Sequence, residues 1–144
     1  MLILGCGNRD RGDDAAGVLV AERLRALGIP AQICSGSSAL MDAWSEAPDV
    51  LVIDCVVTGS PAGTVHAWAA RHLPPLARTS ASTHGFGLRE AIELSRALGC
   101  LPARLRIYGI EGINFAIGSS LSKEVQEAVE RVAARIAIEG KEET

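Results

Sequence analysis

Residues 1–34 read MLILGCGNRDRGDDAAGVLVAERLRALGIPAQIC, and this stretch decides the fold. The aliphatic run Met1–Leu4 predicts a buried strand, the segment Ala15–Leu27 has the spacing of a helix, and Ala31–Cys34 predicts a second strand. Neighbouring parallel strands need a crossover connection, which is right-handed in nearly all proteins. The stretch therefore predicts a βαβ unit and a parallel sheet.

The same alternation continues along the chain. The further predicted elements are a helix at Ser38–Glu46, a strand at Val50–Val57, a half-buried or edge strand at Thr64–Trp68, a long loop from Pro74 to Thr83, a helix at Leu88–Leu98, a strand at Arg104–Ile110, a last helix with Ser122 as its N-cap, and a frayed tail at Gly140–Thr144. This order is typical of an α/β fold. We expect a three-layer α/β/α sandwich with a mostly parallel central sheet, in which an edge strand is the candidate for antiparallel pairing.

Composition limits the classes of function. The 144 residues fit one domain, 1–144, and their 48% hydrophobic content excludes a disordered chain. A net charge of −3 gives no electrostatic footprint for nucleic acid or an anionic membrane. No apolar run approaches membrane-spanning length, and no C-x-x-C pair occurs among the four cysteines. We expect a cytoplasmic monomer with reduced thiols.

The glycine-rich turn after the first strand carries two adjacent carboxylates. It runs from Gly5 to Gly17 and contains Asp13 and Asp14 at the start of the predicted helix. Aspartate is a preferred N-cap, but two adjacent acids cannot both cap one helix. In open α/β sheets ligands bind beyond the carboxyl ends of the strands, so we expect one of these carboxylates to cap and the other to face that crevice.

Two further residues with metal-binding side chains follow predicted strands or loops of the same edge. Asp54 ends the apolar run Val50–Ile53, and His84 lies between the long loop and the next helix. Asp14, Asp54 and His84 would offer two hard oxygen ligands and one nitrogen, a set suited to a divalent transition metal with open positions. His66 and His72 are interpreted as surface residues.

The same residues suggest three other functions. A dinucleotide site fails because Asp10 stands where G-x-G-x-x-G needs its third glycine. A receiver-like phosphoacceptor domain would use Asp13, Asp14 and Asp54, but it needs a lysine where this chain ends a strand in Glu111. A cysteine nucleophile would pair Cys6 or Cys55 with His84 and has no supporting motif.

Four segments, in order, resemble the hydrogenase maturation protease family, the endopeptidases that process the large subunit of nickel-iron hydrogenases. They are Gly5-x-Gly7-Asn8-x-x-x-Gly12-Asp13-Asp14-x-x-Gly17, the apolar strand ending in Asp54, the loop with His84 before Gly87-Leu88, and Gly109-Ile110-Glu111 with Gly118-Ser119-Ser120-Leu121-Ser122-Lys123-Glu124-Val125. The resemblance spans nearly the whole chain.

This resemblance implies a function for the same three residues. The family's metal-recognition positions fall on Asp14, Asp54 and His84, and Asp54 and Asp14 are the implied catalytic residues of an aspartic-type or metal-dependent endopeptidase. The implied substrate is a hydrogenase large-subunit precursor that carries nickel, so no permanently bound cofactor is expected. A noncatalytic metal-binding relative remains the alternative within the family.

Overall fold

The structure is a computed structural model that describes residues 1–74, 78–79 and 87–142. Its elements in chain order are β1 (Leu2–Cys6), the 3₁₀ turn η1 (Gly12–Ala15), α1 (Ala16–Ala26), β2 (Gln32–Cys34), α2 (Ser37–Trp44), β3 (Asp49–Val57), β4 (Val65–Ala69), the 3₁₀ turn η2 (Ala70–His72), β5 (Arg78–Thr79), α3 (Leu88–Ala97), β6 (Arg104–Glu111) and α4 (Lys123–Glu142). The predicted strands and helices are all present, with ends that differ by a few residues.

The strands form a mixed sheet in the order β2-β1-β3-β6-β4, with β5 paired to the end of β3. The pairs β1–β2, β1–β3 and β3–β6 are parallel, whereas β4 pairs antiparallel with β6. This confirms the mostly parallel sheet with an antiparallel edge strand. The strand β5 pairs antiparallel with β3. The prediction of a loop at Arg78–Thr79 was therefore wrong, because two residues give no periodicity to detect.

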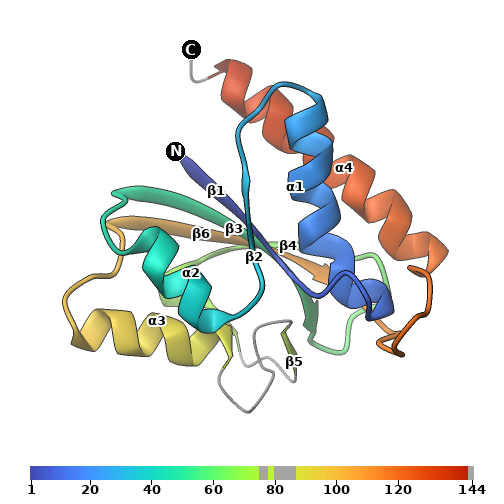
Figure 1. Ribbon diagram of the computed structural model, residues 1–144, viewed down its shortest axis with the longest axis horizontal. Helices are drawn as coiled ribbons and strands as arrows, with labels where there is room; N and C mark the ends of the chain where they lie inside the picture. The colour runs from blue at the N-terminus through green and yellow to red at the C-terminus, as the bar shows by residue number, and fades with distance from the viewer. Residues whose placement is uncertain (75–77, 80–86, 143–144) are drawn as a thin grey trace.

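Helices cover both faces of the sheet (Figure 1). One core packs α1 and α4 on residues such as Ile53 and Ile110, and the other packs α2 and α3 on residues such as Val52 and Ile107. The second layer is tied by the indole N–H of Trp44, which donates to the buried Ser95 hydroxyl at 2.9 Å. The three-layer α/β/α arrangement is therefore confirmed.

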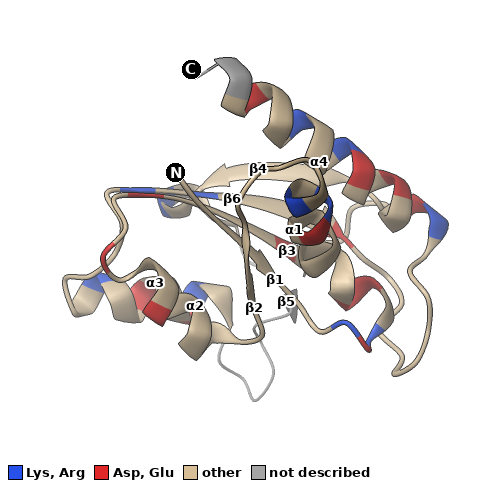
Figure 2. Cartoon of the chain, turned by 45° about the horizontal axis from the view of Figure 1, so that its top comes forward, with Lys and Arg blue, Asp and Glu red and all other residues tan. Residues whose placement is uncertain are grey.

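The last helix ends later than the sequence predicts. The last helix continues through Gly140 to Glu142, so the predicted frayed tail is wrong for these residues. Both basic and acidic residues lie along α4 (Figure 2), which agrees with the weak net charge. None of the described helices is both long and apolar enough to cross a bilayer.

The amino end of α1 packs directly on the strands through glycines. A Cβ at Gly17 would overlap the carbonyl oxygen of Ile53, and a Cβ at Gly5 would overlap the backbone of Gly17. Gly7 likewise lies against the carbonyl oxygen of Asp14. These glycines let the helix approach the sheet and set Asp14 beside the strand ends, so the glycine pattern serves helix packing.

Replacing Gly17 with alanine tests this packing. In an open helix alanine is favoured over glycine by about 1 kcal/mol. At Gly17 the methyl group has no space, so we expect Gly17→Ala to lower the free energy of unfolding by about 3 kcal/mol in urea denaturation. Gly140, which lies in α4, has no atom within 4 Å of an added Cβ, so Gly140→Ala should be neutral or stabilising. Equal effects of the two substitutions would contradict the packing argument.

Candidate functional site

The carboxyl ends of β1 and β3 form the crevice of the sheet. β1 lies between β2 and β3. The connection from β1 therefore leads to one side of it, to β2, and the connection from β2 leads to the other side, to β3. Such a switch point is where open α/β sheets bind ligands. Asp14 lies on η1, which follows β1, and is 3% exposed, whereas Asp54 lies within β3 and is fully buried. The structure therefore brings these two predicted site residues to one edge.

Asp54 occupies the seam between two strand pairings. β3 pairs with β1 up to Ile53 and with β5 from Val56 onward, while β6 occupies its other side. Asp54 shares the sheet face of Val52 and Val56, because side chains alternate along a strand. Its Oδ1 accepts the N–H of Cys55 at 2.8 Å. The local chain geometry thus holds the carboxylate at the strand end.

Four carboxylates surround the Cys55 thiol at this edge. Burial raises the pKa of Cys55, and nearby negative charges raise it further, namely those of Asp54, Asp14, Asp13 and Glu111. These four are also all of the buried carboxylates among the residues that the structure describes. A concentration of negative charge in a desolvated edge favours a cationic ligand.

The two candidate thiols, Cys6 and Cys55, do not have the lowered pKa of a nucleophile. A hydrogen bond with Cys34 raises the pKa of Cys6, and burial and the charge of Asp54 raise it as well. The pKa of Cys55 is also raised, as described above. A catalytic cysteine needs a lowered pKa, because the thiolate is the reactive form. The structure therefore disfavours the cysteine-nucleophile interpretation.

Asp13 braces a distant loop instead of capping α1. The N-cap position of α1 is Ala15, with no side-chain cap, because η1 precedes the helix without a break. The two carboxylate oxygens of Asp13 accept hydrogen bonds at 2.7–3.0 Å from the backbone N–H groups of Ile113, Asn114 and Ser122 and from the Ser122 hydroxyl. The prediction that Asp13 or Asp14 caps the helix is therefore wrong.

Ser122 stands where it was predicted, directly before α4. Its carbonyl accepts the N–H of Gln126 at 3.0 Å, as the first bond of the helix. Its hydroxyl is committed to the carboxylate of Asp13. The residue therefore joins the start of the last helix to the site.

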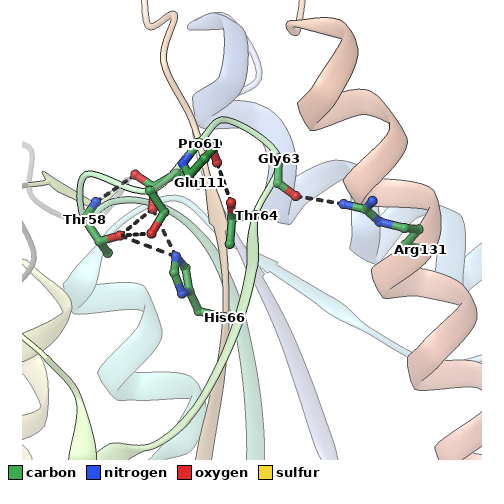
Figure 3. A network of polar contacts seen from close by, with 8 residues as sticks. Thr58, Pro61, Gly63, Thr64, His66, Glu111 and Arg131 are labelled. Atoms are coloured by element: carbon green, nitrogen blue, oxygen red, sulfur yellow. Dashed lines mark hydrogen bonds and ion pairs between the residues drawn. The ribbon is translucent and has the colours of Figure 1, made fainter.

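A second buried carboxylate network lies at the same edge (Figure 3). Glu111 ends β6 and is 1% exposed. Its Oε2 accepts the N–H of Thr58 at 2.8 Å, and its Oε1 accepts the Thr58 hydroxyl at 2.6 Å and lies 3.0 Å from His66 Nε2. The turn after β3 is thereby tied to β6 and β4. The interpretation of His66 as a surface residue is wrong.

The charge state of Glu111 follows from these contacts. Burial alone raises the pKa of this carboxyl group, but hydrogen bonds from Thr58, from His66 and from the Gly59 backbone outweigh burial and lower the pKa below its ordinary value. An ionised carboxylate only accepts hydrogen bonds, so His66 Nε2 carries the proton between them. Sequence reasoning did not assign Glu111 to the site, although Glu111 ends the apolar strand β6.

The third predicted metal residue, His84, lies outside the described residues. The described chain around it reaches the same edge, because Thr79 pairs with Val56. Arg89 of α3 follows His84 in the chain and donates a hydrogen bond at 2.7 Å to the carbonyl of Pro74, which precedes His84. Within the described part of the chain, no three His, Cys, Asp or Glu side chains are arranged as a metal site. The three-residue site stays a prediction.

The two remaining alternatives meet physical objections at this edge. A receiver domain needs a cation facing its phosphoryl group, whereas β6 ends in the buried carboxylate of Glu111. A dinucleotide pyrophosphate would face Asp13, Asp14 and Asp54, whose charges repel it. The arrangement favours a ligand that carries positive charge.

Glu111 gives the fold a defined response to acid. Because its pKa in the folded chain is lowered from 4.5, its ionised form stabilises the fold above that pH, and this contribution is lost as the pH falls through the lowered pKa. We expect Glu111→Gln to lower the free energy of unfolding by about 2 kcal/mol at pH 7. In urea titrations the difference from the wild type should shrink as the pH falls below 4.5 and through the lowered pKa of Glu111. The exposed Glu127→Gln is the control, and a difference that does not change with pH would contradict this role.

Several hydrogenase maturation proteases of known structure share this architecture. The chain is 23% identical to the [NiFe] hydrogenase maturation protease HybD from Thermococcus kodakarensis, with 96% of each chain covered and a TM-score of 0.72. It is 27% identical to HycI from Thermococcus kodakarensis KOD1, with 94% of this chain and 88% of that chain covered and a TM-score of 0.70. For the maturating endopeptidase HybD from E. coli, the identity is 20%, the coverage 99% and 92%, and the TM-score 0.72. No curated protein matches the chain.

The family comparison rests on the sequence itself. The model of the HycI hydrogenase maturation protease family matches residues 34–139. That range includes Asp54 and His84 and is well over half of the chain. The fold, the buried acidic edge and this match agree, and the chain belongs to the hydrogenase maturation protease family.

Proposed function

We propose that this maturation peptidase removes a C-terminal peptide from the nickel-loaded large-subunit precursor of a nickel-iron hydrogenase. The observation that carries the proposal is the placement of Asp14 and Asp54 as buried carboxylates at the switch point of the sheet. Family membership supports the reaction. A metal cation on the substrate accounts for the buried carboxylates at one edge of the sheet.

In this proposal the nickel ion belongs to the substrate. Asp14, Asp54 and His84 contact it and so orient the precursor, which makes the presence of nickel a condition for cleavage. Two carboxylates and an imidazole are donors that accept a divalent transition metal without filling its coordination sphere. The protein needs no permanently bound cofactor and acts as a cytoplasmic monomer.

Cleavage of the peptide bond needs water to be activated next to the carbonyl. Asp54 is the proposed general base, because its buried carboxylate lies toward the carboxyl end of β3 and is held there by the N–H of Cys55. Asp14 assists by fixing the metal and hence the position of the scissile bond. This assigns aspartic-type chemistry to the protein, with the metal as part of the recognised substrate.

The test is a cleavage assay with purified large-subunit precursor, loaded with nickel or free of it. We expect the wild-type protein to shorten only the nickel-loaded precursor, as seen by gel shift and by the mass of the released peptide. Asp54→Asn should reduce the rate by about 10²- to 10⁴-fold, the usual contribution of a general base. Asp14→Asn and His84→Ala should raise the concentration of nickel-loaded precursor that cleavage requires.

A matched control lies in the same turn. Asp10 is exposed and takes part in the fold through its backbone, so Asp10→Asn should cleave like the wild type. Full activity of Asp54→Asn would refute the proposed base. Nickel-dependent binding of the precursor by the wild type without any cleavage would identify a noncatalytic relative, and labelling of Asp54 by a small phosphodonor with Mg²⁺ would identify a receiver.

A further inference from the structure

A pocket lined by arginines lies at the edge of the sheet opposite the candidate site. β6 begins at Arg104 on this side and ends at Glu111 on the other. Because β4 runs antiparallel to β6, the end of β4 lies beside the start of β6, where Ala69 pairs with Arg106. The pocket between them has a volume of about 410 Å³. Its four basic residues are Arg71, Arg96, Arg104 and Arg106.

The four arginines of this arginine pocket come from three separate elements. Arg71 lies in η2, directly after β4, and Arg96 lies in the last turn of α3. Arg104 and Arg106 are two positions apart in β6, so they share one face of that strand. Like charges repel at short range, and the fold therefore gains from an anion that compensates the charges gathered here.

Two of the four arginines have only weak carboxylate partners. Arg96 Nη1 lies 3.3 Å from Glu93 Oε1, and Arg104 Nη1 lies 3.7 Å from Asp49 Oδ2. The two arginine side chains are 50% and 57% exposed. Ion pairs between exposed side chains contribute little, because water and salt screen them. A bound anion can therefore draw both guanidinium groups away from these partners.

The other two arginines have no carboxylate partner within the described part of the chain. None of the ion pairs formed there includes Arg71 or Arg106. Arg106 Nη2 donates to the Sδ atom of Met1 at 2.9 Å, and a thioether is a weak, uncharged acceptor. Its Nε is shielded from solvent and has no hydrogen-bond partner among the described residues. The positive charge of Arg106 is therefore left uncompensated.

The size and lining of the arginine pocket favour a small organic phosphate. Its volume falls within the range of small-molecule sites, roughly 300–1,000 Å³. Guanidinium groups bind phosphate through pairs of parallel N–H···O bonds, and a phosphate monoester carries about −1.5 to −2 charge at pH 7. Leu101, Pro102 and Leu105 line the same pocket and offer apolar contacts to the carbon part of such a ligand.

We propose that the arginine pocket is a binding site for a small phosphate monoester, with Arg71 and Arg106 as its main charge partners. The inference goes beyond the proposed function, because it uses no residue of the candidate site and lies at the other edge of the sheet. A ligand held there would connect η2, α3 and β6. It would therefore stabilise the folded chain in proportion to its affinity and concentration.

The test is isothermal titration calorimetry of the full chain with glycerol 3-phosphate, inorganic phosphate and citrate, at equal ionic strength and near neutral pH. We expect glycerol 3-phosphate to bind saturably with a Kd below about 1 mM, and inorganic phosphate to bind more weakly, because it lacks the carbon part. Arg71→Gln with Arg106→Gln should weaken the binding of glycerol 3-phosphate by about 10-fold or more, since charge-assisted hydrogen bonds are lost.

The matched control is Arg9→Gln with Arg23→Gln, which removes the same charge from two exposed arginines outside the pocket and should bind like the wild type. Circular dichroism checks the fold of both double variants. If the pocket variant does not fold, Arg71→Gln alone decides, because that side chain is exposed.

Three results would overturn the inference. The first is a wild-type protein that shows no saturable binding of glycerol 3-phosphate. The second is equal weakening in the pocket variant and the control, which would mean that only the net charge matters. The third is tighter binding of citrate or of inorganic phosphate than of glycerol 3-phosphate, which would assign the pocket to a polycarboxylate or to free phosphate instead.

Discussion

The structure depends on the close approach of α1 to the ends of β1 and β3. Gly5, Gly7 and Gly17 leave no room for side chains, so the helix backbone lies directly against the strand backbone. This contact positions the 3₁₀ turn, and the turn places Asp14 at the switch point, at the same edge of the sheet as Asp54. A bulkier residue at any of these positions would separate the helix from the sheet and the two carboxylates from each other.

The buried carboxylates at this edge serve two different purposes. Asp13 and Glu111 have their oxygens occupied by backbone N–H groups and hydroxyls, so they act as internal braces for the loops on either side. Such charged hydrogen bonds repay the cost of burying an ion. Asp14 and Asp54 lie at the same edge of the sheet and are the pair that the proposed chemistry uses.

Sequence reasoning recovered the elements whose signals are local. Aliphatic periodicity located β3 and α4, and the rule for open α/β sheets placed Asp14 and Asp54 at one edge. It missed the role of Asp13, since the partners of its side chain lie about a hundred residues away in the chain. It also missed the pairing of Glu111 with His66, because only the antiparallel edge strand β4 brings them together.

The brace between Asp13 and Ser122 also orders the events of biosynthesis. The two residues are 109 positions apart, so the contact cannot form until nearly the whole chain has left the ribosome. The first βαβ unit can fold earlier from its own short-range contacts, but its acidic turn remains without its partner loop. A nascent or truncated chain without residues 113–122 therefore lacks the partners that hold the carboxylate of Asp13.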